Sequence, residues 1–283
     1  MVENKKEVSC VFFPYDCHVH TSFCDGKVTA EEMLSHAYRM GYKAFGLSVH
    51  SPLPFKNDYA LPKEEENTYI RTLQALKFRY RGKMDVLMGI EWDYDTPYGF
   101  PQYDYRIGSV HQLFSGTRYY ALDYTEEELS ACIRDMFGGH VDAFLSYYFN
   151  AVETSAMRGG VDIVGHFDLL TKYNRASRFF DENGSRYREF ALNALRRIAA
   201  KRPDVLFEVN VGGMYRVGRV YPYPAPFLLR ELARLRVKMT LTSDAHSPDG
   251  LGYKESNVLT LCRNCGHRAV YGLSSKGLVE VLL

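Results

Sequence analysis

"AFGLSVH", residues 44–50, is the stretch that most directly indicates the fold. It is a short apolar run that ends in a polar residue, which is typical of a parallel strand buried on both faces. The preceding segment 29–41, "TAEEMLSHAYRMG", has a helical pattern in which Thr29 and Glu32 fit a capping box and Gly41 fits the C-terminal cap. A helix that leads into a buried strand predicts an α/β protein.

The same alternation of strands and helices continues along the chain. Six further strands are expected, at 15–20, 84–93, 105–113, 161–167, 204–211 and 238–246. The other helices are expected at about 63–81, 125–137, 141–158, 185–202 and 225–236. Neither a linker nor a repeat interrupts this pattern, so we predict a single α/β domain over 1–283. The longest segments without a predicted helix are expected to be loops around a site, and they are 51–62, 93–104 and 212–224.

Composition excludes several classes of protein. The 283 residues are 46% hydrophobic and 24% charged, as in an ordinary globular protein, and a single α/β barrel commonly has this length. The net charge of +1 gives no overall attraction for nucleic acid or for an anionic membrane. No apolar run is long enough to span a membrane, and "MVENKKEVSC" at 1–10 lacks the apolar core of a signal peptide. We therefore expect a cytoplasmic protein with reduced cysteines, and the oligomeric state stays open.

Residues that can bind metal ions recur at the carboxyl ends of the predicted strands. Every strand except the sixth supplies at least one, and the set is His18, His20, Asp25, His50, Glu91, His111, His166, Asp244 and His246. Residues two apart on a strand point to the same side, so each His-x-His or Asp-x-His pair converges. In a closed parallel barrel all strand ends gather around one mouth. Nine such ligands could hold two or three divalent ions.

The alternative interpretation is that these histidines belong to the core or the rim. A single strand histidine usually does, and we prefer this interpretation for His36, His140 and His267, which lie on helix or loop patterns. Chance would scatter ligand types over both ends of the strands. Their clustering at one end therefore favours a metal site.

The motifs at these positions resemble the PHP (polymerase and histidinol phosphatase) family, and within it the histidinol-phosphate phosphatases. They occur in the family's order over residues 15–250 and read "HVH" (18–20) with Asp25, "SVHSP" (48–52), "GIEWDY" (89–94), "GSVH" (108–111), "GHFDLL" (165–170), "EVN" (208–210) and "SDAH" (243–246). The resemblance implies a distorted (β/α)7 barrel, which agrees with the seven expected strands.

The resemblance also implies three metal ions. The first would be held by His18, His20, Glu91 and Asp244. Glu91 would bridge to the second, which His111 and His166 also hold, and the third would be held by Asp25, His50 and His246. Imidazole mixed with carboxylate suits Zn, Mn or Fe, so two to three of these divalent ions are expected. Glu91, Asp244 and His246 are the expected catalytic residues.

The implied chemistry is hydrolysis of a small phosphate monoester. Adjacent metals lower the pKa of a bridging water, and the resulting hydroxide would attack the phosphorus in line. The expected substrate is L-histidinol phosphate, which would yield L-histidinol and phosphate in histidine biosynthesis. Arg216 and Arg219 are expected to bind the phosphate, although solvated loop arginines are almost as good an interpretation.

The imidazole and ammonium of that substrate need a second set of contacts. The loop "WDYDTPYGFPQYDY" (92–105) supplies Asp93, Asp95 and several tyrosines, which could receive the ammonium by charge and stack on the imidazole. An equally good interpretation is that these residues only shape a solvated loop.

Two other functions stay open. One is another PHP-type phosphoesterase that acts on nucleotides or phosphotyrosine, although the near-neutral charge disfavours long nucleic acids. The other is a metal-bound regulatory protein without turnover, which the intact ligand set disfavours. The chain departs from the family pattern at Val49, where an acidic residue is common, and in the slightly displaced arginine at 216. "CRNCGH" at 262–267 also lies outside the pattern, and we expect Cys262 and Cys265 to be incidental thiols.

Overall fold

The structure is a computed structural model that describes residues 12–97 and 99–283. Seven parallel strands form one sheet in the order β1-β2-β3-β4-β7-β8-β9. They are β1 (Tyr15–Asp16), β2 (Ala44–His50), β3 (Asp85–Asp93), β4 (Tyr105–Ser109), β7 (Ile163–Val164), β8 (Leu206–Asn210) and β9 (Met239–Thr242). A bridge between Val19 and Ala245 joins the two edges, where the His20 amide donates to the Ala245 carbonyl at 2.9 Å. The sheet therefore nearly closes into the expected barrel.

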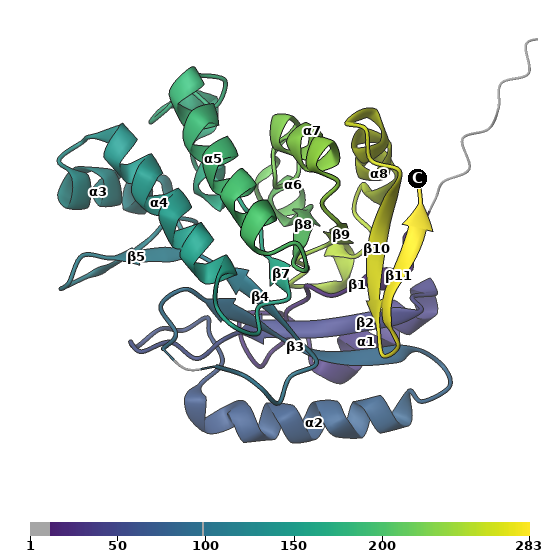
Figure 1. Ribbon diagram of the computed structural model, residues 1–283. Helices are drawn as coiled ribbons and strands as arrows, with labels where there is room; N and C mark the ends of the chain where they lie inside the picture. Colours follow the sequence, from purple (N-terminus) through teal and green to yellow (C-terminus); the bar gives the residue numbers. More distant parts are fainter. Residues whose placement is uncertain (1–11, 98) are drawn as a thin grey trace, which may run out of the picture.

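The α-helices lie around the outside of the strands, with α2 on the opposite side of the molecule from α5 and α7 (Figure 1). They are α1 (Ala30–Met40), α2 (Glu66–Arg79), α3 (Glu126–Phe137), α4 (Val141–Ala156), α5 (Ser185–Lys201), α6 (Gly212–Val217), α7 (Pro226–Leu235) and α8 (Glu255–Asn264). Short 3₁₀ turns lie at Lys63–Glu65, Leu169–Thr171, Arg175–Ser177 and Pro248–Gly250. None of the helices in residues 12–97 and 99–283 is long and apolar enough to cross a membrane.

The predicted caps of α1 are confirmed. The Thr29 side chain accepts from the Glu32 amide, and the Glu32 carboxylate accepts from the Thr29 amide at 2.9 Å. Gly41 ends the helix in the left-handed region at φ 91°, which a glycine adopts without steric cost. The cap turns the chain into β2, whose residues are buried along the whole strand.

The amino-terminal end of the barrel is filled by apolar side chains. The inner cluster consists of Cys17, Leu87, Tyr105, Ile107, Ile163 and Leu206. Tyr105 crosses the interior and donates from its hydroxyl to the Cys17 carbonyl at 2.6 Å. Gly46 and Gly89 leave room for its ring, because a Cβ would lie 2.2 Å from a Tyr105 atom at Gly46 and 2.1 Å at Gly89. The packed interior forms a base beneath the carboxyl ends of the strands.

The fourth predicted strand, 105–113, is wrong in its extent. β4 ends at Ser109, and the chain leaves the barrel at His111 to form a hairpin of β5 (Gln112–Phe114) and β6 (Tyr119–Ala121). The Leu122 amide donates to the His111 carbonyl at 2.8 Å and so fastens the hairpin to the strand end. The predicted strand therefore covers parts of two strands that belong to different sheets.

Two helices and a second hairpin were not predicted either. α6 begins at Gly212, in the segment 212–224 that was expected to lack a helix. α8 and the hairpin of β10 (Ala269–Ser274) and β11 (Gly277–Leu282) follow the last predicted strand. Tyr271 and Leu273 of β10 pack on the inner cluster, so this hairpin covers the amino-terminal end of the barrel.

Candidate metal centre

Glu91, at the carboxyl end of β3, lies at the centre of a cluster of histidines. Its Oε1 is 2.8 Å from His166 Nε2 and 3.1 Å from His111 Nε2. Its Oε2 is 2.9 Å from His50 Nδ1 and 3.3 Å from His18 Nε2. The two carboxylate oxygens therefore face different pairs of histidines, which is the geometry that a bridging ligand needs.

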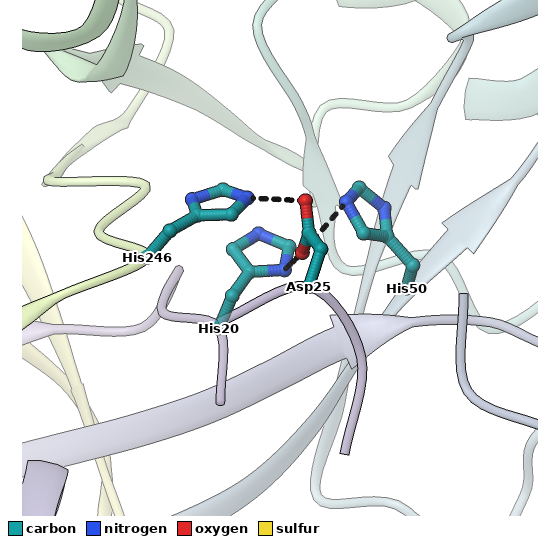
Figure 2. Close-up of side chains that lie close together, drawn as sticks. All are labelled: His20, Asp25, His50 and His246. Atoms are coloured by element: carbon teal, nitrogen blue, oxygen red, sulfur yellow. Dashed lines mark ion pairs between the residues drawn. The ribbon is translucent and has the colours of Figure 1, made fainter. Parts of the chain in front are cut away.

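Asp25 is the centre of a second group on the same mouth of the barrel. Figure 2 shows its carboxylate between the rings of His20, His50 and His246. Asp25 Oδ1 lies 3.7 Å from His20 Nδ1 and 3.7 Å from His50 Nε2, and Oδ2 lies 3.1 Å from His246 Nε2. The loop after β1, the end of β2 and the loop after β9 thus meet at one point.

Asp244 joins the two groups. Its Oδ1 is 3.2 Å from His20 Nε2 and 3.8 Å from His18 Nε2. All nine predicted ligands consequently meet at the carboxyl ends of the strands. Their side chains form four overlapping sets that could each hold an ion, namely His20, Asp25, His50 and His246; His18, His20 and Asp244; His18, Glu91 and His166; and His50, Glu91 and His111. These sets differ from the expected ones in detail, because His20 joins the Asp25 group and His111 and His166 fall in separate sets.

The cluster has the unsatisfied atoms that a bound cation would require. His18 Nε2, His20 Nε2, Asp25 Oδ1 and Glu91 Oε2 are buried and have no hydrogen-bond partner among the described residues. Buried polar atoms in folded proteins almost always have a partner. Lone pairs of imidazole and carboxylate directed at a shared space fit divalent transition metals.

Charge within the cluster acts differently on different ligand-type side chains. Burial opposes ionisation of Glu91, but the imidazoles of His111 and His18 outweigh it and hold the pKa of Glu91 well below its usual range. Burial, together with the neighbouring His246 and His50, lowers the pKa of His20 to about 3. Glu91 is therefore an anion and His20 a neutral imidazole at neutral pH, the forms that coordinate a metal. Burial opposes the charge of His18, His50 and His111, but the carboxylates beside them raise the pKa of each. A bound metal would have to displace protons from these three imidazoles.

Glu208, in the middle of β8, is a site residue that was not predicted as one. Its carboxylate lies 2.5 Å from His18 Nδ1, and it accepts from the His166 amide at 2.6 Å. Thr242 and Asn210 donate to it as well, at 2.6 Å and 3.1 Å. An acidic residue inside the apolar strand "LFEVN" is the signal that could have identified it.

Asp93 is hydrogen bonded to the ring nitrogen of His111 that faces away from Glu91. The side chain is buried, and its Oδ2 lies 2.7 Å from His111 Nδ1 while its Oδ1 accepts from Gln112 Nε2 at 2.8 Å. Both oxygens are engaged away from the pocket, so the geometry favours a positioning role over the expected contact with a substrate ammonium. Cys24 has a comparable place beside His20, with its Sγ 3.5 Å from Nδ1.

A pocket of about 600 Å³ opens above the ligands. Asp25, His50, His111, His166 and Asp244 line its base, and Arg216 of α6 lies beside them with Nη1 3.1 Å from His246 Nε2. The pocket can therefore present a cation beside the metal ligands.

Arg219 is placed differently from Arg216. Its Nη1 donates to the Thr171 carbonyl at 2.6 Å, its Nη2 lies 3.5 Å from Glu182, and its guanidinium lies over the Tyr223 ring. Arg219 does not line the pocket, because these contacts fix it in the loop after α6. The phosphate contact expected of Arg219 therefore has no support from its geometry.

The remaining three histidines and the two free cysteines of the C-x-x-C motif lie outside the cluster. His36 is exposed on α1, and His140 is exposed at the start of α4. His267 is buried, with Nε2 2.8 Å from the Leu229 carbonyl. Cys262 lies in α8 and Cys265 at its end, and neither belongs to a candidate metal group in the described part of the chain.

Residues 16–211 match the family model described as the PHP domain. This chain belongs to the PHP domain family. Among its PHP relatives is the Deinococcus radiodurans protein named "Probable histidinol-phosphatase", with 28% identity over 90% of this chain and 95% of the relative. The Bacillus subtilis protein named "Histidinol-phosphatase" is 27% identical over 87% of this chain and 98% of its own length.

Solved structures share the PHP barrel. A Listeria monocytogenes protein described as a candidate histidinol phosphatase has a TM-score of 0.73 and 21% identity, over 86% of this chain and 98% of that one. The histidinol phosphate phosphatase of Lactococcus lactis, solved with Zn, L-histidinol and phosphate, has a TM-score of 0.66 and 20% identity, over 93% and 98% of the two chains. At these identities the likeness establishes the fold.

Proposed function

We propose that this PHP protein is a phosphoric monoester hydrolase that converts L-histidinol phosphate to L-histidinol and phosphate in histidine biosynthesis. The observation that carries the proposal is the position of Glu91 among the other eight ligand-type side chains at the base of a pocket. A cavity of about 600 Å³ suits a small ester. The names of the Deinococcus and Bacillus relatives support this substrate. The cytoplasmic location expected from the sequence stays a prediction.

Two to three divalent ions, Zn, Mn or Fe, are proposed as the cofactors. Glu91 would be shared between ions, with His111 and His166 on one side and His18, His20 and Asp244 on the other. Asp25, His50 and His246 would hold the third ion. Zn in the Lactococcus structure supports a metal of this class. Bound ions would supply Lewis acidity, which activates water and neutralises phosphate charge.

The chain's own residues would bind and orient the ester. Arg216 is the protein cation best placed for the phosphate, because it lines the pocket beside Asp244 and His246. Burial opposes its charge, but the carboxylates of Asp244 and Asp123 raise the pKa of Arg216, which therefore stays charged. A fixed guanidinium offers paired donors to phosphate oxygens and stabilises charge that develops on them. We propose Glu91, Asp244 and His246 as catalytic residues that surround the reacting phosphate.

The proposal is tested by steady-state kinetics of the full chain after loading with Zn or Mn. Histidinol phosphate should be preferred over an aryl phosphate by at least roughly tenfold in kcat/KM. Equal turnover of the aryl phosphate, a nucleotide or a phosphotyrosine peptide would replace the proposal with a broader PHP phosphoesterase. No phosphate release from any of them would favour a regulatory protein without turnover.

The role of Glu91 has its own comparison. Glu91→Gln should lower kcat/KM by at least roughly a hundredfold, because it removes the charge shared between two ion sites. His36→Gln, on the exposed face of α1, should leave kcat/KM unchanged. Equal effects of the two substitutions would contradict the proposed metal centre.

A further inference from the structure

The pocket holds two carboxylates that are not among the proposed metal ligands. They are Asp58, in the loop before α2, and Asp123, two residues after the end of β6. Asp58 is exposed, whereas the Asp123 side chain is only 22% exposed. Water and salt screen an exposed charge more strongly than a partly buried one. Of the two, Asp123 is therefore the stronger partner for a cationic group in the pocket.

The β5–β6 hairpin fixes the backbone of Asp123 beside the metal ligand His111. Gln112 pairs with Ala121 in the hairpin, and the next residue, Leu122, donates to the His111 carbonyl at 2.8 Å. Asp123 is thus one residue away from a backbone hydrogen bond to a ligand. Its distance from the metal centre is set by strand register, which is a rigid constraint.

Lys172 fixes the side chain of Asp123. Its Nζ lies 2.9 Å from Asp123 Oδ2. Lys172 lines the pocket and is itself buried, with only 6% of its surface exposed. Burial opposes the charged form, but the Lys172 ammonium holds the pKa of Asp123 below its usual range, so Asp123 is an anion at neutral pH. No hydrogen bond from residues 12–97 or 99–283 reaches Asp123 Oδ1. This oxygen can accept a hydrogen bond from a ligand.

The ion pair of Asp123 and Lys172 matches the charges of the proposed substrate. In histidinol phosphate the carbon that carries the ammonium is bonded to the carbon that carries the phosphate ester. Bond lengths place the ammonium nitrogen within roughly 5 Å of the phosphorus. Lys172 and Asp123 likewise present opposite charges side by side, with Arg216 in the same pocket. Complementary charges at this spacing orient a ligand and discriminate against one that lacks a charge.

We propose that Asp123 is a specificity-determining residue that binds the α-ammonium of the substrate through Oδ1. Lys172 acts as a positioning residue that holds the carboxylate in place. The pocket accordingly selects phosphate monoesters of 1,2-amino alcohols. This inference rests on the proposed function and assigns to Asp123 the contact that Asp93, turned away behind His111, cannot make.

The test compares L-histidinol phosphate with 3-(imidazol-4-yl)propyl phosphate, which is the same ester without the amino group. Asp123→Asn in the metal-loaded full chain should lower kcat/KM for histidinol phosphate by at least roughly tenfold, about 1.4 kcal/mol. The same variant should change kcat/KM for the deaminated ester by less than about threefold. Asp58→Asn, the matched control, should keep the wild-type preference between the two esters.

A binding measurement gives a readout that is independent of turnover. Calorimetric titration of L-histidinol in the presence of phosphate should show weaker binding to Asp123→Asn by the same factor, and Asp123→Glu should restore part of it. An equal loss on both esters, or unchanged binding of L-histidinol, would overturn the role of Asp123. Wild-type protein that hydrolyses both esters equally well would overturn it too, even if no variant folds. Wild-type protein that hydrolyses neither would instead contradict the proposed function.

Discussion

Glu208 and His18 are hydrogen bonded inside the barrel, with 2.5 Å between Glu208 Oε1 and His18 Nδ1 and both side chains fully buried. The bond leaves His18 Nε2 facing Glu91. Carboxylates in this position fix the orientation and the tautomer of a metal-binding imidazole. The opposite nitrogen of His18 is thus directed at the candidate metal centre.

We predict that Glu208→Gln weakens metal binding by roughly 10- to 100-fold. The Glu208 carboxylate accepts from four donors, on His18, Thr242, Asn210 and the His166 amide. A glutamine would turn its own NH₂ group toward one pair of them, so donors would face donors. Metal retained after dialysis against graded chelator measures the effect. Glu189→Gln, on the exposed face of α5, is the control. Equal retention by wild type and Glu208→Gln would contradict the prediction.

Asp93→Asn should lower kcat/KM for histidinol phosphate and for an aryl phosphate by the same factor, roughly 10- to 100-fold. The Asp93 carboxylate holds His111, whose other nitrogen faces Glu91, and it makes no contact that depends on the leaving group. Kinetics on the two substrates test this. A rise in KM confined to histidinol phosphate would restore the direct ammonium contact expected from the sequence.

The parts of the fold that sequence could predict are local or periodic. The caps of α1 involve residues three apart, and the ligands stand at strand ends because buried parallel strands are apolar until they emerge. The roles of Asp93 and Arg219 could not be predicted in the same way. The direction in which each of these side chains points depends on a partner from another segment. The partner is His111 for Asp93 and Thr171 for Arg219.

Neither Glu208 nor α6 was predicted, because each depends on contacts between residues that are far apart in the sequence. His18, the partner of Glu208, is 190 residues away along the chain. α6 begins at Gly212 and Gly213, although glycine disfavours helices. The site requires them, because a Cβ would lie 2.7 Å from Asp244 Oδ2 at Gly212 and 2.6 Å from the Tyr223 ring at Gly213. Close approach in three dimensions overrides local propensity at both residues.

Gly89→Ala should destabilise the barrel by about 1–3 kcal/mol or more. The new Cβ would lie 2.1 Å from the Tyr105 ring, and displacing that ring also breaks its hydrogen bond to the Cys17 carbonyl. Urea unfolding measures the loss. Gly159→Ala, where a Cβ meets no atom within 4 Å, is the control. In a Tyr105→Ala background the cost of Gly89→Ala should largely disappear, and a cost that persists there would mean that Tyr105 is not its cause.

Glu255→Gln should stabilise the protein at pH 8 and leave it nearly unchanged at pH 5. Glu255, at the start of α8, is buried, and burial together with the nearby Asp16 raises its pKa from 4.5 to about 7. Between about pH 4.5 and pH 7, the folded state therefore keeps a proton on Glu255 that the unfolded state has already lost. Stability falls as pH rises from about 4.5 to about 7 and is then constant, with a total change of up to about 3 kcal/mol.

Glutamine avoids this loss because it is neutral at every pH. It can also keep both contacts, since its carbonyl can accept from the Phe13 amide and its NH₂ can donate to the Tyr42 hydroxyl oxygen, where the glutamate oxygens now lie at 3.3 Å. Urea unfolding of wild type and Glu255→Gln at pH 5 and pH 8 gives the comparison, with the exposed Glu189→Gln expected to show no such pH-dependent gain. A variant that is less stable than wild type at pH 8 would mean that Glu255 is ionised and stabilising in the folded protein, so that the cost of its burial is offset by its neighbours.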